Sequence, residues 1–272
     1  YARLQEDLER IDLKFGEILS DPGSTVDFVY FPITCIVSLT FTTLTGASVE
    51  LAMIGSEGLV GIPLVLGGLT TNHRAVVQSP GMAYRLKVEV IRWELDQGGN
   101  LQHLALRHAQ ALMTQMAQSV VCNRHHAIDQ QLCRWLLLSL DRLDSPQIHM
   151  TQELIASFLG VRREAITDTA GKLQLAGLIQ YSRGYINIID RAGLEARACE
   201  CYGVVKAEYE RLFQIAPETR LRSRARPNPE TVRSRAEARW MQTPPEVAKT
   251  AWDNAQLVHE LQVHQIELEM HN

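Results

Sequence analysis

The stretch Thr151–Ile189, "TQELIASFLGVRREAITDTAGKLQLAGLIQYSRGYINII", decides how the chain folds. Thr151 is a candidate N-cap for an amphipathic helix, and Gly160 breaks that helix. A second amphipathic helix begins in "RREAITDTAGKL", directly after the glycine turn. Two short runs typical of strands, "LIQY" and "YINII", then flank the turn "SRG". Two helices joined by a glycine turn and closed by a hairpin predict a winged helix-turn-helix domain that binds DNA.

The second helix carries the side chains that we expect to meet DNA. Its first turn holds Arg162, Arg163 and Glu164, and Thr167 follows one turn on. A recognition helix enters the major groove with its N-terminal residues, where Arg fits guanine and Glu accepts from cytosine. Phosphate contacts are expected from three further residues, Thr151, Lys172 and Arg183. An isolated Arg-Arg-Glu triplet indicates no more than solvated charge, but its place between a glycine turn and a wing favours DNA contact.

Residues 1–97 have a different composition. Short runs rich in Val, Ile, Thr and aromatic residues are separated there by Gly, Pro, Asn and Ser. The runs are "VDFVYFP", "CIVSLTFTTL", "SVELAMIG", "RAVVQ" and "MAYRLKV". Strands at this close spacing indicate a small barrel or sandwich. Ahead of them, "ARLQEDLERIDLKFGEIL" has Leu and charge at near-helical spacing and predicts a short leading helix.

A long helix is expected between Leu101 and Leu143, a segment without Pro or Gly. Its apolar stripe at three- or four-residue steps, or their sums, consists of Leu101, Leu104, Leu112, Met116 and Val120. Ala105 and Ala109 lie beside the stripe and permit close approach of another helix. The pattern fits two interpretations: packing on the helix's own domain, or the seam of a coiled-coil dimer.

Bulk properties exclude several classes of protein. A chain of 272 residues with a net charge of -4 and 46% hydrophobic residues suits a globular protein of one to three domains. No apolar run approaches the roughly 18 residues that span a bilayer, and no export signal is visible. Residues 150–190 hold four basic and four acidic residues, so the DNA footprint is expected to be local. No nucleophile elbow, P-loop or HExxH motif supports an enzyme.

The cysteines are odd in number and scattered, without a CxxC motif: Cys35, Cys122, Cys133, Cys199 and Cys201. This usage favours a reducing cytoplasm over a disulfide framework and does not fit a usual iron–sulfur centre. Cys122 lies near His125 and His126, a pairing compatible with zinc or haem. These histidines are expected at a helix surface or interface, so no metal site is predicted. Cys199 and Cys201, two apart on a helix, are expected to point to different sides and to serve ordinary packing rather than redox sensing.

The C-terminal part changes character twice. Residues 191–213 predict an amphipathic helix interrupted at Gly203. Residues 217–240 hold seven Arg and three Glu among prolines, which is typical of an exposed linker. The final segment "DNAQLVHELQVHQIELEMHN" predicts another helix.

Taken in order, these segments and the stretches "GLVGIPLVLGG", "NHRAVVQ" and "TQELIASFLGVRREAITDTAGKLQLAGLI" resemble bacterial transcription regulators of the CRP/FNR superfamily. The resemblance covers roughly residues 5–213. It implies an α+β fold with a jelly-roll-like β-roll effector domain at 1–97, a dimerisation helix and hinge at 98–144, and a winged helix-turn-helix with a following helix at 145–213. Residues 214–272 are then a linker and a helical tail, and "LVHELQVHQIELEMHN" resembles the lead-in to a PAS domain.

The resemblance also implies a homodimer on a two-fold symmetric operator, with RNA polymerase as a further partner. Family base-reading positions fall on Arg163 and Glu164, and backbone contacts on Arg162 and Thr151. A further family Arg is replaced here by Asp168, which would repel phosphate or pair with Arg163 or Arg183.

Cyclic-nucleotide-binding members of the superfamily use a Gly-Glu pair for the ribose and an Arg for the phosphate. Here Gly61 is followed by Ile62 and Pro63, whereas Arg74 stands near the phosphate position, after Asn72 and His73. Cyclic AMP is therefore disfavoured, and the segment closes the β-roll, holds another ligand, or retains a cyclic nucleotide. No cofactor is predicted; haem would need an axial ligand such as His73 or Cys35.

The sequence thus predicts a cytoplasmic, sequence-specific DNA-binding transcription regulator. The alternative is a ligand- or redox-gated signalling module whose output lies in a C-terminal PAS-like or other domain. The Arg-rich linker and the acidic last helix favour that alternative.

Overall fold

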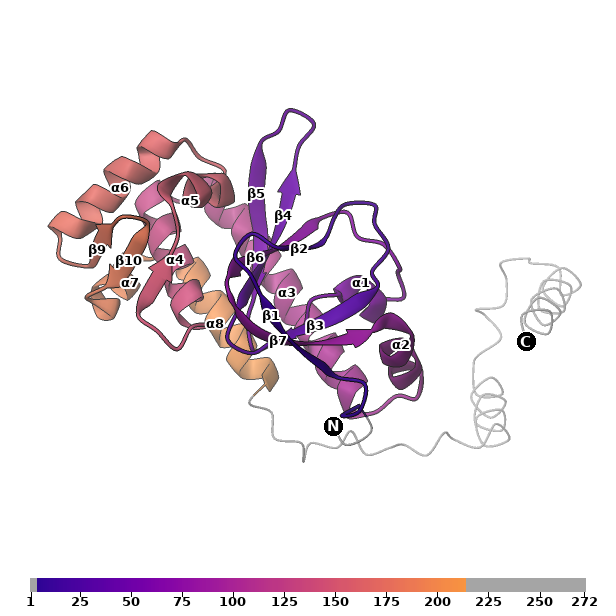
Figure 1. Cartoon of the computed structure of the whole chain (residues 1–272). Helices are drawn as coiled ribbons and strands as arrows, with labels where there is room; N and C mark the ends of the chain where they lie inside the picture. The colour runs from indigo at the N-terminus through magenta and orange to yellow at the C-terminus, as the bar shows by residue number, and fades with distance from the viewer. Residues whose placement is uncertain (1–3, 214–272) are drawn as a thin grey trace, which may run out of the picture. The chain divides into compact units, whose positions relative to one another are not determined.

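Alternating apolar residues build a β-roll at the start of this computed structural model, which describes residues 4–213 (Figure 1). One sheet has the order β1-β7-β3 and the other β2-β6-β4-β5. The strands are β1 (Glu9–Leu13), β2 (Ile18–Ser20), β3 (Phe28–Pro32), β4 (Ile36–Thr42), β5 (Ser48–Ile54), β6 (Arg74–Ser79) and β7 (Gly81–Lys87). Strands β3 to β7 confirm the five predicted runs.

The predicted leading helix is wrong. Residues 9–13 form β1, which pairs antiparallel with β7 from Glu9↔Arg85 to Leu13↔Gly81. Glu9 and Arg85 also form an ion pair across the two strands, with 2.7 Å between Oε2 and Nε. Cross-strand pairing therefore outweighs a helical spacing that covers only a few turns.

The long helix predicted over residues 101–143 is divided in two. The structure has α3 (Asn100–His125) and α4 (Ile128–Leu140), with extended backbone at His126 and Ala127, where ψ is 150° and 156°. Gln131 Nε2 donates to the carbonyls of Cys122 and His126, at 3.3 and 2.9 Å, and so holds this corner. No Pro or Gly marks the corner, which is why the sequence did not predict it. Two shorter helices, α1 (Ile62–Val65) and α2 (Val88–Asp96), lie on the β-roll side.

Helix α3 buries one face on the β-roll. Ala105 and Leu112 belong to the roll's apolar clusters, and Leu101 and Met116 pack against them. The opposite face is exposed and carries Leu106, Met113 and Val120, which are 44%, 59% and 70% exposed. The predicted stripe therefore mixes two environments: Leu101, Leu112 and Met116 pack on the helix's own domain, whereas Leu104 and Val120 are exposed.

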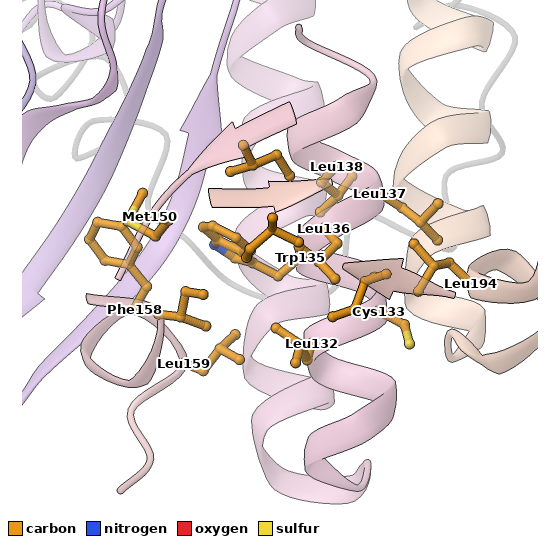
Figure 2. Close-up of a cluster of buried hydrophobic side chains, with 14 of the residues drawn as sticks. Leu132, Cys133, Trp135, Leu136, Leu137, Leu138, Met150, Phe158, Leu159 and Leu194 are labelled. Carbon is orange, nitrogen blue, oxygen red and sulfur yellow. The ribbon is translucent and has the colours of Figure 1, made fainter. Parts of the chain in front are cut away.

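The winged helix-turn-helix predicted from residues 151–189 is confirmed. Its elements are β8 (Gln147–His149), α5 (Gln152–Leu159), α6 (Arg163–Leu175), β9 (Ile179–Ser182), β10 (Tyr185–Ile188) and α7 (Arg191–Arg197). Trp135 of α4 is buried at the centre of its core, with its ring 6.3 Å from that of Phe158 on α5 (Figure 2). Ile36 and Met53 of the β-roll belong to the same apolar cluster, so this core is continuous with the roll.

The helix predicted over residues 191–213 is broken, but not at Gly203. The break lies at Ala198 and Cys199, between α7 and α8 (Glu200–Phe213), and Gly203 is inside α8. Helix α8 lies alongside α3 (Figure 1). The described residues, 4–213, group into one unit, within which the boundaries at 97 and 144 stay a prediction. The predicted linker, tail helix and PAS lead-in lie outside the described residues.

Candidate nucleic-acid interface

The first turn of α6 presents the predicted base-reading side chains to solvent. Gly160 ends α5 in the left-handed conformation (φ 68°), and the chain re-enters a helix with Arg162 as N-cap. Arg163 and Glu164, in the first turn, are exposed, as is Arg162. The buried side of α6 includes Ile166 and Leu173, both fully inaccessible to solvent. This packing fixes which side of α6 faces outward.

Thr167 locks the two helices of the motif together. Its Oγ1 donates to Gln152 Oε1 at 2.6 Å and contacts the carbonyl of Arg163 at 3.1 Å. Gln152 was not singled out in the sequence, although it follows the N-cap of α5 directly. Thr151 caps α5 by accepting from the amide of Leu154 at 3.3 Å. The Thr151 side chain thus stabilises the start of α5 and is also exposed at the surface.

An open hollow of about 310 Å³ separates α5 from the wing. It is lined by Thr151, Gln152, Glu153, Arg163, Tyr181 and Gly184. The N-terminus of α5 opens into it, and helix N-termini attract anions through their free amides. The amides at the start of α5 are thus the groups in this hollow that suit an anion, whereas Glu153 adds a negative charge.

The wing turns through Arg183 and Gly184. Both have positive φ, 51° and 83°, and Ser182 pairs with Tyr185 across the two-residue loop. This is the backbone of a type I′ hairpin turn, which Asn-Gly suits best. Among the described non-glycine residues, Arg183 alone has positive φ.

The suggested pairing of Asp168 with Arg163 or Arg183 is wrong. Asp168 Oδ2 lies 2.7 Å from Lys172 Nζ, one turn along the same helix. Residues four apart on a helix share a face, whereas the two arginines lie elsewhere. The hydrogen bond and charge of Asp168 raise the pKa of Lys172. Lys172 therefore stays protonated, but the charge of Asp168 beside it offsets its own at this face of α6.

The segment that resembles a nucleotide cassette has little room for a ligand. Gly61 and His73 line a cavity of only about 10 Å³, against the roughly 300 Å³ or more of usual ligand sites. Burial lowers the pKa of His73, which is hydrogen-bonded to Thr71 Oγ1 at 3.0 Å. Arg74 Nε instead pairs with Asp21 Oδ1 at 2.6 Å, and Asn72 is exposed. Of the four predicted pocket residues, two thus line the cavity and two do not.

A buried arginine that the sequence did not point to joins four parts of the molecule. Arg142, just after α4, pairs through Nε with Glu57 Oε1 of the β-roll at 2.7 Å. Its other nitrogens donate to Leu138 O and, in α3, to Gln115 Oε1, at 2.8 and 3.1 Å. The guanidinium lies 5.5 Å from the ring of Tyr209 in α8. Burial is the largest single effect and lowers the pKa of Arg142, but the charges of Glu57, Tyr209 and Asp141 and the hydrogen bond to Glu57 together raise it.

The prediction that Cys199 and Cys201 diverge is also wrong. Both lie with Cys122 and His126 in one group whose ligand atoms are within 4.8 Å of one another. Cys199 precedes the first residue of α8, so helical spacing does not apply to the pair. Cys35 lies in a separate buried cluster of the β-roll.

Comparisons with known proteins agree with this arrangement. Residues 130–197 match the family described as the Crp-like helix-turn-helix domain, and a search of curated proteins found no match. A crp/fnr-family protein from Eubacterium rectale is 16% identical, with a TM-score of 0.56 over 71% of this chain and 91% of its own. The fold is that of the CRP/FNR regulators.

Two further CRP/FNR-fold structures have the same arrangement. FixK2 from Bradyrhizobium japonicum is 13% identical, with a TM-score of 0.60 over 71% of this chain and 98% of its own. A CRP-family regulator from Thermus thermophilus is 17% identical, with a TM-score of 0.58 over 70% and 96%. At such identities the likeness establishes the fold, and the match to the Crp-like domain covers α4 through α7. Among the described helices, none is long and apolar enough to cross a membrane.

Proposed function

We propose that this chain is a sequence-specific DNA-binding transcription regulator that binds a two-fold symmetric operator as a homodimer. The observation that carries the proposal is the exposed Arg162-Arg163-Glu164 turn at the start of α6, behind a glycine turn and beside a wing. Arg163 and Glu164 read base edges, while Arg162, Thr151 and Arg183 contact the backbone. Lys172 and Thr167 lie further along α6 and adjust the position of this helix on the DNA. Contact with RNA polymerase rests on the family resemblance.

The exposed face of α3 supports the homodimer. Leu106, Met113 and Val120 follow one another at seven-residue intervals, and each is more than 40% exposed. A heptad of exposed apolar residues is the pattern of a coiled-coil seam, in which a second copy of the helix covers the stripe. Dimerisation through α3 would present two copies of α6 to successive half-sites.

The β-roll supports the proposal that no cyclic nucleotide binds in the cassette-like segment. A 10 Å³ cavity cannot hold a cyclic nucleotide, and Asp21 already neutralises Arg74. We therefore propose that Gly58–Gly68 closes the β-roll, the first of the three interpretations of this segment.

Selection from random duplex DNA followed by anisotropy titration tests the proposed function. We expect an enriched palindromic motif, and we expect Arg163→Ala to weaken binding to it by about 1–3 kcal/mol, as for loss of a bidentate guanine contact. Arg92→Ala on α2, also an exposed arginine, is the matched control and leaves the affinity unchanged. If no motif is enriched at moderate salt, the alternative of an output in a further C-terminal domain is favoured instead.

A further inference from the structure

Four potential ligands converge where α3 ends and α8 begins. Cys122 is in the last turn of α3, and His126 is the C-cap, whose amide donates to the carbonyl of Cys122 at 3.1 Å. Cys199 and Cys201 lie at the start of α8. The Sγ atoms of Cys122 and Cys199 are 3.5 Å apart, and Cys201 Sγ is 3.6 Å from His126 Nδ1. The three cysteines are buried and the histidine is half-buried.

The two distances are close to edges of a tetrahedral zinc site. With Zn–S near 2.3 Å and Zn–N near 2.0 Å, two sulfurs lie about 3.8 Å apart and a sulfur and a nitrogen about 3.5 Å apart. Three cysteines with one histidine form a usual structural zinc set, and soft thiolates disfavour magnesium and calcium. We propose that Cys122, His126, Cys199 and Cys201 bind one zinc(II) ion.

The groups around the cluster suit a bound metal. His126 Nε2 lies 3.2 Å from Glu200 Oε1, so its Nδ1 is left free to face the three sulfurs. A carboxylate on the far nitrogen is the usual support of a metal-binding histidine. Gln131 holds the carbonyls of Cys122 and His126 and so fixes the backbone that carries two of the four ligands.

The charge balance is also favourable. Zinc with three thiolates carries a net charge of -1, and the buried Arg134 guanidinium lies within coulombic range of Cys122 and Cys201. Zinc binds cysteine as the thiolate, so metal binding releases protons. Among the described residues, Arg134 Nε has no hydrogen-bond partner, which leaves a donor for a thiolate.

The site fastens the end of α3 to the helix that follows the DNA-binding domain. Two ligands precede the corner between α3 and α4, and two follow α7. Zinc at this point would hold α8 on α3 and fix the corner through which α4 enters the winged domain. The inference does not depend on the proposed function, because a metal can be counted whether or not the chain binds DNA.

Metal analysis of the full chain tests the proposal. The protein, expressed with added zinc and purified under argon with a non-thiol reductant, is expected to carry about one zinc per chain by mass spectrometry of the elements. Cys199→Ala is expected to lose the zinc, whereas Cys35→Ala, at a buried cysteine of the β-roll, is expected to keep it. Circular dichroism of each variant identifies any that fails to fold. Wild-type protein without zinc, or a folded Cys199→Ala variant with full zinc content, would overturn the proposal.

Cobalt(II) gives a second readout. The apo-protein loaded with cobalt is expected to show the intense visible bands of tetrahedral coordination and sulfur-to-cobalt charge transfer. Glu200→Gln keeps all four ligands, so the bands are expected to persist while zinc affinity falls about 10- to 100-fold. Weak octahedral bands, or a mass two hydrogens lower that reports a Cys122–Cys199 disulfide in the protein as isolated, would overturn the assignment.

Discussion

At the scale of single residues, Arg183 has a left-handed backbone conformation that glycine and asparagine adopt more readily. Its φ of 51° lies in the left-handed region, where a non-glycine, non-asparagine residue costs about 1 kcal/mol. An exposed arginine in a strained turn of a wing is consistent with selection for contact rather than for stability. The wing thereby gives a residue at which folding and DNA binding can be separated.

Arg183→Asn is expected to stabilise the fold and weaken DNA binding at once. Asn-Gly fits the type I′ turn, so the free energy of unfolding should rise by about 0.5–1 kcal/mol. Loss of a phosphate contact should weaken binding and reduce the slope of log affinity against log salt by about one. Urea unfolding and anisotropy at several salt concentrations measure the two effects. A variant less stable than wild type, or one with an unchanged salt slope, contradicts this assignment.

Glu50 is a second informative residue, because opposing effects act on the pKa of its buried carboxyl group. Burial raises its pKa to about 7, although Ser38 and the charges of Arg134 and Arg142 lower it. Ser38 Oγ lies 2.5 Å from Glu50 Oε2 and 2.6 Å from Gln78 Oε1, and a hydroxyl has one proton to donate. A protonated Glu50 resolves this, because it donates to Ser38 while Ser38 donates to Gln78.

The raised pKa of Glu50 in the folded chain makes the stability of the fold depend on pH. The folded chain binds a proton at Glu50 more tightly than the unfolded chain, so the neutral form stabilises the fold fully below about pH 4.5. The stability is lost as pH rises to about 7, by no more than about 3 kcal/mol. Glu50→Gln should remove this loss, so its stability relative to wild type should increase between about pH 5 and pH 8. Urea midpoints over that range measure it; a difference that does not change with pH refutes it.

At the scale of elements, two glycines of the segment that resembles a nucleotide cassette act in packing. A Cβ at Gly58 would lie 2.5 Å from Nδ1 of His108, whose ring is buried against it and whose Nε2 contacts Leu59 O at 3.1 Å. Gly61 begins α1 with φ of 125°. The segment that follows β5 therefore needs glycine at position 58, where its backbone lies against His108 of α3.

Gly58→Ala is expected to destabilise the chain by about 1–3 kcal/mol, as for overpacking of a core. The same substitution in a His108→Ala background should cost close to nothing, since the ring that meets the new methyl group is gone. A double-mutant cycle on chemical unfolding gives the coupling between the two sites. Equal costs in both backgrounds would show that Gly58 is needed for another reason.

Local patterns were enough to predict some elements and not others. The strands β3 to β7 and the pair α5–α6 follow from alternation, caps and turn glycines, which act within a few residues. The corner at His126 depends on Gln131 reaching back to two carbonyls, and no local residue type signals it. The first strand was missed because β7, some seventy residues away, supplies its partner.

The candidate sites divide in the same way. Arg162, Arg163 and Glu164 could be predicted because a recognition helix is recognisable from its own sequence and flanks. The zinc cluster could not, since Cys122 and Cys199 are brought together by the packing of α8 on α3. Arg142 was missed for the same reason, as its partners come from the β-roll, α3 and α8.

At the scale of the whole molecule, the surface of α3 decides how many copies assemble. Its inward face serves the β-roll and α8, so the outward stripe of Leu106, Met113 and Val120 is left uncovered among the described residues. In a parallel two-fold pair, Met113 of one copy faces Met113 of the other. A charge placed there would meet its own image across the seam.

Met113→Glu is therefore expected to break the dimer and leave the fold intact, because the side chain is 59% exposed in the single chain. Two facing carboxylates and the lost apolar contact should cost several kcal/mol, or about a 100-fold weaker dimer. Leu104→Glu is the matched control, since Leu104 is 48% exposed but lies nine residues, or half a helical turn in angle, from Met113. Sedimentation equilibrium should show monomers for Met113→Glu and dimers for Leu104→Glu. Operator affinity should fall with the dimer, because each protomer alone reaches a single half-site; dimeric Met113→Glu protein would place the interface elsewhere.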